Sequence, residues 1–125
     1  MYGTRLGHMA LSTNRYRSIF AEGIHIAGGS DAYITPIHPI LGVHAAVNHP
    51  NQLEALEVGP ALRMFAFGGP YAVSKENYCG TLEKGKEASF VILSDDPFDI
   101  DKADLRKILV DSVYKNGENI YNIDN

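Results

Sequence analysis

The sequence predicts an α+β chain, with helical segments in the first two thirds and strands in the last third. Apolar residues recur at helical spacing over 15–22 and 40–48. A nearly continuous apolar run occupies 89–94, which is typical of a buried strand. Two half-alternating stretches then flank Asn116 and Gly117, the strongest short pattern for a β-hairpin. Helices followed by strands, rather than alternating with them, favour the α+β class.

Glycine residues mark the expected boundaries of the first elements. Residues 1–14 are polar and rich in glycine, and we expect an arm or loop there. The helix over 15–22 is expected to end at Gly23, because glycine readily takes the left-handed conformation that closes a helix. The run from Ile24 alternates apolar and variable residues, so we expect a short strand over 24–28.

The middle of the chain is predicted to be helical again. The helix over 40–48 would place Ile40, Val43 and Val47 on one side. Pro60 suits the first turn of another helix, where its missing N–H costs nothing. That helix is expected to stop at the glycine pair 68–69, and a further turn to begin at Pro70. Glu54 and Glu57 are interpreted as solvated charges.

The last third is predicted to form one antiparallel sheet. We expect 79–94 to form a strand, a glycine turn and a second strand, and 109–121 to pair with them. Residues 90–93 are all apolar, so both faces of that strand are expected to be covered. A short helix over 101–108, with Asp101 as its N-cap, would connect these strands.

Composition excludes several classes of protein. The 125 residues are 45% hydrophobic and 21% charged, which suits one ordinary globular domain. A net charge of -4 without a clustered basic face argues against a nucleic-acid partner. No apolar run reaches the roughly 18–20 residues of a membrane span, so no membrane partner is expected. The lone Cys79 cannot form an internal disulfide, which suits a cytoplasmic location.

The order of several short motifs resembles the C-terminal end of the metal-dependent amidohydrolase superfamily. The closest resemblance is to the branch described as exoenzyme-regulatory, or as a metal-dependent hydrolase with a composite domain. The matching motifs are GSD at 29–31, TPIHPILGVHAAV at 35–47, ALRMF at 61–65, GPYAV at 69–73, G-x-L-x-x-G-K-x-A at 80–88 and NG-x-x-I-Y at 116–121. Two positions depart from the family pattern: Ser89 replaces an aspartate, and Ala66 replaces a threonine.

The resemblance implies a fold in two parts. Residues 15–78 would be the end of a (β/α)8 barrel, with 24–31 as its last strand, and 79–125 would be the C-terminal strands of a composite β-sandwich. The chain would then be the C-terminal portion of a longer hydrolase that acts on C–N bonds of a small-molecule substrate.

Asp31 is the candidate catalytic residue and metal ligand. Barrel active sites lie at the C-terminal ends of the strands, where Asp31 falls. The resemblance implies that this carboxylate binds a divalent metal, zinc first among them, and accepts a proton from the metal-bound water. Judged from the residues alone, an aspartate after Gly-Gly-Ser is also a common turn in which the side chain caps its own backbone. Both alternatives stay open.

His38, in the loop after that strand, is the candidate for substrate binding. The resemblance places the other metal ligands on barrel strands that precede these 125 residues. A catalytic zinc site needs about three protein ligands, so this chain alone is expected to bind no metal and to be inactive. The other histidines, His8, His25, His44 and His49, are expected to have surface or packing roles.

Two functions of different classes follow. The chain is either the C-terminal fragment or domain of an amidohydrolase-like enzyme, or a non-catalytic remnant that serves as a binding, regulatory or structural module. In both cases the missing barrel and sandwich neighbours would leave strand edges and apolar faces exposed. Such surfaces favour association, and we expect a homo-oligomer, most simply a dimer.

Overall fold

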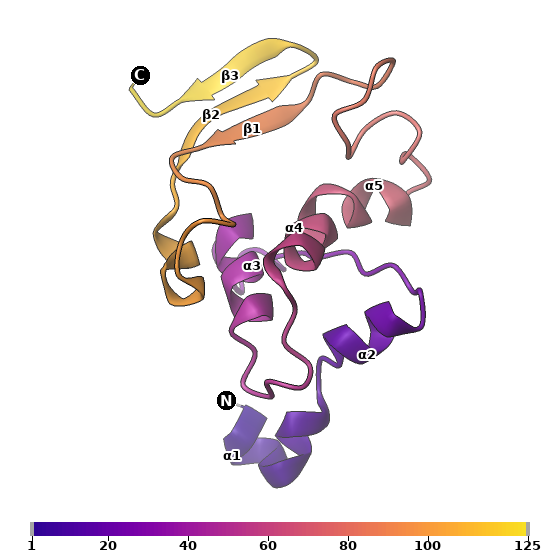
Figure 1. Ribbon diagram of the computed structural model, residues 1–125, viewed down its shortest axis with the longest axis vertical. Helices are drawn as coiled ribbons and strands as arrows, with labels where there is room; N and C mark the ends of the chain where they lie inside the picture. The colour runs from indigo at the N-terminus through magenta and orange to yellow at the C-terminus, as the bar shows by residue number, and fades with distance from the viewer. Residues whose placement is uncertain (1, 125) are drawn as a thin grey trace.

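Helices form the first part of the chain and one small sheet forms the last part. The computed structural model describes residues 2–124, and for 2, 3, 10 and 11 the backbone only. The helices are α1 (Tyr2–Leu6), α2 (Tyr16–Ala21), α3 (Pro39–Val47), α4 (Val58–Ala66) and α5 (Gly68–Ala72), with the 3-10 helices η1 (Gly7–Ser12) and η2 (Lys102–Lys107). The strands are β1 (Phe90–Leu93), β2 (Val110–Lys115) and β3 (Glu118–Asn122) (Figure 1). The predicted mixture of helices and a small antiparallel sheet is confirmed.

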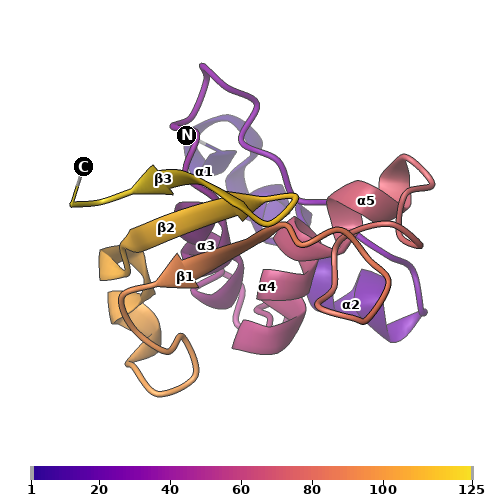
Figure 2. The same cartoon turned by 90° about the horizontal axis from the view of Figure 1, so that it is seen from above.

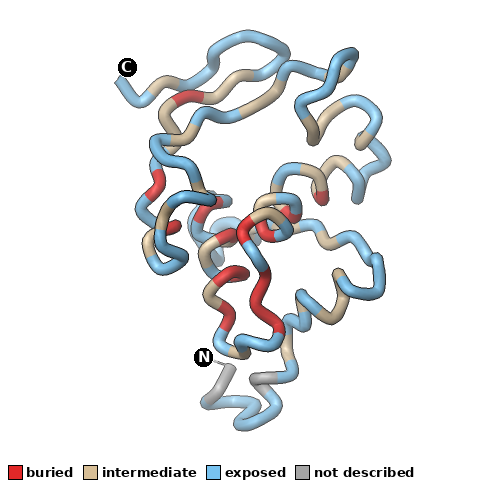
Figure 3. The backbone as a smooth tube through the Cα atoms, in the orientation of Figure 1, coloured by how far each residue is buried: buried red, intermediate tan, exposed pale blue. Residues whose placement is uncertain are grey.

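The hydrophobic core lies where α3, α4 and η2 meet. Its buried residues are Ile40, Val43, Ala46 and Val47 of α3, Leu56, Val58, Ala61 and Met64 in and before α4, and Leu105 and Ile108 in and after η2. Figure 3 shows the buried backbone gathered at this junction, while the N-terminal helices are exposed or intermediate. The core is therefore helical, and the sheet contributes little to it.

Local sequence explains why α3 and α4 form there. Pro39 occupies the first turn of α3, where its fixed φ favours a helix. Ile40, Val43 and Val47 recur at helical spacing and are all buried, as predicted. Pro60 lies in the first turn of α4, although that helix begins two residues earlier than expected. No helix in the described range, 2–124, is long and apolar enough to cross a membrane.

The sheet has the strand order β1-β2-β3, with both pairs antiparallel (Figure 2). Val91 pairs with Val113, which pairs in turn with Tyr121. The hairpin between β2 and β3 turns at Asn116 and Gly117, whose φ angles are 53° and 83°. Two successive positive φ angles are what the favoured two-residue hairpin turn requires, so the hairpin prediction is confirmed.

The prediction that both faces of 90–93 are covered is wrong. Val91 is 53% exposed and Ile92 is 45% exposed. Only Leu93, at one end of β1, packs against the core, because η2 and the helices reach no farther along the sheet. Phe90 is half-buried and stacks on the ring of Tyr114, with 4.7 Å between ring centroids.

Four local expectations also differ from the structure. Within the arm or loop expected over 1–14, the described residues 2–12 form α1 and η1. No strand forms over 24–28, nor ahead of β1 in 79–89, where Gly80 and Gly85 instead make turns with positive φ. The helix expected at 101–108 is the tighter 3-10 helix η2, although Asp101 does cap it: its carboxylate accepts the N–H of Ala103 at 2.8 Å.

Truncating the core should cost far more stability than truncating the surface. Leu105 is fully buried, whereas Leu53 is 79% exposed. We expect Leu105→Ala to lower the free energy of unfolding by about 2–5 kcal/mol, because the lost methyl groups leave a cavity. Leu53→Ala should change it by less than about 0.5 kcal/mol. Urea denaturation followed by circular dichroism measures both, and equal effects would contradict a core at the α3, α4 and η2 junction.

Candidate functional site

The segment 24–30 runs between α2 and α3 without a turn or bend and lies against α4 and α5 (Figure 1). The N–H of Gly28 donates to the carbonyl of Met64 in α4 at 2.9 Å. A Cβ on Gly28 would lie 2.7 Å from the ring of Phe65, and one on Gly68 would collide with the Ile26 backbone. Glycine at both positions therefore permits the close approach that fixes this segment in place.

The segment is not a strand because none of the described residues provides a neighbouring strand for it. The N–H groups of Ile24 and Gly28 are bonded, to the carbonyls of Ile19 and Met64. The carbonyls of 24–29 accept no hydrogen bond from the described part of the chain, and the other N–H groups donate none. The alternating sequence thus specifies an extended backbone, but sheet formation requires a partner that this fold does not contain.

Asp31 follows this segment in an exposed turn. Its φ is +50°, in the left-handed region that aspartate tolerates better than most residues. The turn is closed by the Ile34 N–H, which donates to the Asp31 carbonyl at 2.8 Å, and by the Thr35 hydroxyl, which donates to the Ser30 carbonyl. The Asp31 carboxylate makes no hydrogen bond or ion pair with the described residues. It does not cap its own backbone and can contact groups outside this fold.

His38 lies at the other end of the same loop, at the N-cap position of α3. Its ring is half-buried and makes no hydrogen bond to the helix, while its carbonyl accepts the Leu41 N–H at 3.0 Å. No hydrogen bond joins His38 to Asp31 among the described residues. The structure thus places both candidates in the loop 31–38 without a hydrogen bond between them, and their roles stay predictions.

The residues present do not fit a metal centre of their own. Over 2–124, no group of three or more His, Cys, Asp or Glu side chains lies close enough to hold a metal ion. His44 and His49, which could have served as ligands, instead stabilise the fold. The His44 Nδ1 lies 2.8 Å from the Asn48 amide, and the buried His49 ring accepts the Asn51 N–H at 3.1 Å. Metal binding by Asp31 would therefore require ligands from outside these residues.

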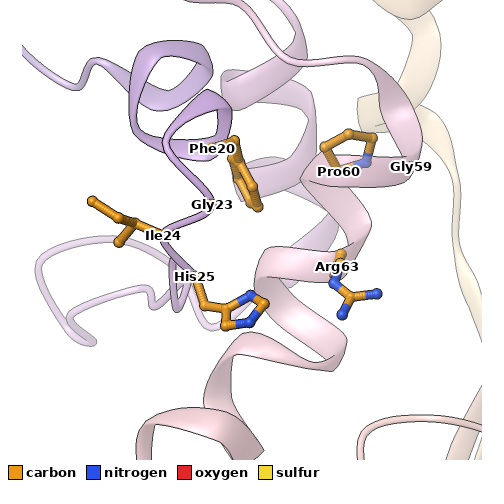
Figure 4. Close-up of a pocket in the computed structure, with 7 residues that line it drawn as sticks. All are labelled: Phe20, Gly23, Ile24, His25, Gly59, Pro60 and Arg63. Atoms are coloured by element: carbon orange, nitrogen blue, oxygen red, sulfur yellow. The ribbon is translucent and has the colours of Figure 1, made fainter.

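An open depression of about 540 Å³ lies between α2 and α4. Its lining residues are Phe20, Gly23, Ile24, His25, Gly59, Pro60 and Arg63 (Figure 4). The Arg63 guanidinium lies 4.3 Å from the centroid of the Phe67 ring, and the edge of His25 packs against Tyr71. Sequence reasoning missed this depression, since its residues come from distant positions with no characteristic spacing. It lies beside the segment 24–30 but does not include Asp31.

Glu54 is buried, so its interpretation as a solvated charge is wrong. Its carboxylate accepts the Ser18 hydroxyl at 2.5 Å and the Ser18 N–H at 2.9 Å, and Arg15 lies 3.5 Å away. The Ser18 hydroxyl, the Ser18 N–H and the Arg15 charge lower the pKa of Glu54 from 4.5, against the opposing effect of burial. Glu54 thus anchors α2, and with it the start of the segment 24–30. Glu57 is exposed, as expected.

Comparisons with known proteins agree with the resemblance in the sequence. Residues 2–121 match the sequence model of the amidohydrolase family. The Bacillus subtilis (strain 168) protein named "Putative amidohydrolase YtcJ" is 35% identical over 128 residues, which cover 94% of this chain and 24% of that protein. The solved structure of an amidohydrolase from Thermotoga maritima MSB8 superposes with a TM-score of 0.71 at 21% identity, covering 95% of this chain and 28% of that one. The chain thus spans about a quarter of the length of these relatives.

Removing the Glu54 charge should destabilise the fold in a pH-dependent way. The pKa of Glu54 is lower in the folded state than its usual 4.5, so its charge stabilises the fold fully above about pH 4.5. This contribution is lost as the pH falls through the folded-state pKa. We expect Glu54→Gln to lower the unfolding midpoint by several degrees at pH 7, and the difference from the unaltered chain to shrink below pH 4.5.

The matched control is Glu22→Gln, since Glu22 is exposed and its carboxylate forms no hydrogen bond or ion pair within the described part of the chain. Thermal unfolding between pH 3 and 7 measures both variants. A destabilisation by Glu54→Gln that stays constant across this range would contradict the charge-dependent anchor.

Proposed function

Because the chain belongs to the amidohydrolase family, we propose that it forms part of a metal-dependent hydrolase that acts on C–N bonds of a small molecule. The observation that carries this proposal is the family match over 2–121, which includes the Asp31 turn. The exposed Asp31 carboxylate, without a partner in the described part of the chain, supports it.

In this proposal Asp31 contributes the carboxylate and His38 contacts the substrate. A carboxylate can accept the proton that an attacking water loses, and a positioned general base of this kind contributes about 10²–10⁴-fold to a rate. The imidazole of His38 can donate a hydrogen bond to a polar group of the substrate. A divalent ion, with zinc as the first candidate, would be held jointly with ligands from the rest of the enzyme.

The same reasoning makes the isolated chain inactive. Asp31 and His38 share no hydrogen bond, and residues 2–124 gather no ligand set for a metal. A non-catalytic binding module is the second candidate function, favoured by the unpaired backbone of 24–30. The two candidates differ in whether Asp31 is needed once the rest of an amidohydrolase is supplied.

Joining the chain to its relative tests the role of Asp31. The matched quarter of YtcJ would be replaced by this chain, and the chimaera assayed on a panel of linear and cyclic amides. We expect Asp31→Asn to lower kcat by about 10²-fold or more, because the amide cannot accept the proton. Elemental analysis should also show less bound metal, and His38→Ala should mainly raise KM.

The control is Asp95→Asn, since Asp95 lies in an exposed turn beyond β1, where its carboxylate accepts the hydroxyl of the neighbouring Ser94. Full activity and full metal content in the Asp31→Asn chimaera would contradict the proposed role. One tightly bound metal ion in the isolated, unaltered chain would contradict its proposed dependence on the rest of the enzyme.

A further inference from the structure

The depression between α2 and α4 contains a positive charge that no acidic residue neutralises. Arg63 of α4 is exposed, and its guanidinium forms no ion pair with the carboxylates of the described chain. At the start of α2, Arg15 pairs instead with Glu54 at 3.5 Å. Arg17 pairs with Glu57 at 3.7 Å. None of the lining residues is acidic, although the whole chain carries a net charge of -4, so the lining favours an anion.

Aromatic stacking holds the Arg63 guanidinium in place. Its carbon atom Cζ lies over the Phe67 ring, 4.3 Å from the centroid. Phe67 stacks in turn on Tyr71, with 5.7 Å between ring centroids. The His25 ring packs edge-on against both, with centroid distances of 5.5 and 4.3 Å. A cation over a ring face is restrained without using its N–H groups, so Arg63 keeps its donors for a ligand.

Apolar side chains complete the lining. Figure 4 shows Phe20, Ile24 and His25 on one side of the depression, and Pro60 and Arg63 on the other. Phe20 is half-buried and Ile24 is 55% exposed, so both offer apolar surface to a ligand. The volume of about 540 Å³ lies within the range of roughly 300–1,000 Å³ that is usual for small-molecule sites.

We propose that this depression binds a small organic anion with a flat apolar body, namely an aromatic monocarboxylate. The fork of the Arg63 guanidinium matches the two oxygens of a carboxylate, and the ligand ring would lie against Phe20. The imidazole of His25 can donate one further hydrogen bond. One permanent positive charge in the lining suits a monocarboxylate better than a phosphate. Binding here requires neither a metal nor Asp31, which lies beyond the far end of the segment 24–30.

Titration of the chain with benzoate, followed by ¹H–¹⁵N NMR, tests the site. We expect the amide signals of the lining residues to shift, and those of the loop 31–38 to stay in place. The dissociation constant should be about 1 mM, because so small a ligand in an open site makes few contacts. Benzamide, which lacks the charge, and acetate, which lacks the ring, should each bind about tenfold more weakly than benzoate.

Two arginine variants isolate the role of the Arg63 charge. Arg63→Gln should weaken benzoate binding about tenfold, because the ion pair is lost. The matched control is Arg106→Gln, since Arg106 is likewise exposed but lies in η2, outside the lining. It removes the same charge from the chain and should leave the affinity for benzoate unchanged. Arg63→Lys keeps the charge without the fork, so its affinity should lie between those of the unaltered chain and Arg63→Gln.

A third variant tests the apolar lining independently of the charge. Ile24→Ala removes apolar surface from a residue that is more than half exposed, so the fold should persist. It should weaken benzoate binding about threefold and leave the affinity for acetate unchanged. Circular dichroism and thermal unfolding check that each variant is folded.

Four results would overturn the proposed site. They are equal affinities for benzoate and benzamide, equal losses in Arg63→Gln and Arg106→Gln, shifts centred on His38 rather than on Arg63, and no shift at all up to about 20 mM benzoate. If Arg63→Gln failed to fold, the comparison of benzoate with benzamide and the effect of Ile24→Ala would still decide. None of these measurements depends on the proposed hydrolase activity.

Discussion

The packing of α3 against α4 is the contact on which the other elements depend. Val43 and Ala61 are almost completely buried between these helices, and the Leu56 N–H donates to the Ala46 carbonyl at 3.0 Å. The remaining elements attach to this pair of helices. Leu105 of η2 packs into its core, Glu54 holds α2, and Met64 holds the segment 24–30 through Gly28. A core of this size leaves most other apolar surface uncovered.

The uncovered surface is where the proposed function lies. The sheet exposes Val91 and Ile92, and the loop after 24–30 exposes Tyr33 and Ile34. In a protein without a partner this exposure lowers stability, because apolar side chains left in water lose about 25 cal/mol of hydrophobic stabilisation for each Å² that is not buried. Asp31 precedes these loop residues, is exposed, and has a carboxylate that forms no hydrogen bond or ion pair in the described fold. The proposed function gives incomplete packing and an incomplete site one explanation, because the fold spans only about a quarter of the length of its amidohydrolase relatives.

Elements that depend on local chemistry could be predicted from the sequence. Pro39 and the spacing of Ile40, Val43 and Val47 determined α3, Gly23 ended α2 with a φ of +74°, and Asn116-Gly117 set the hairpin. Features that depend on contacts with distant parts of the chain could not be predicted in this way. The alternation over 24–28 predicts a strand that does not form, because no neighbouring strand lies beside it in the described chain. The apolar run over 90–93 does form β1 and pairs with β2, but its faces are not both covered, because covering them needs contacts from distant parts of the chain.

The candidate site was predictable only in part, for a related reason. The choice of Asp31 follows from the order of motifs in the sequence; the family match over 2–121 includes this position, and its role stays a prediction. The anchoring of α2 by Glu54 joins residues 36 positions apart, and the depression beside His25 joins α2 to α4. No local pattern encodes such contacts, because they arise only when the α3 and α4 core forms.

Hydrogen exchange on the isolated chain tests most directly whether the peptide N–H groups of the segment 24–30 lack hydrogen-bond partners within this fold. Amides bonded within α3 and α4 should exchange slowly, since they open only when the core opens. The amides of His25, Ala27 and Gly29 should exchange at nearly the rate of an unstructured peptide, and should become protected in the chimaera that joins this chain to the rest of YtcJ. Protection of these three amides in the isolated chain, equal to that of α4, would show that these N–H groups are already bonded and would contradict the account.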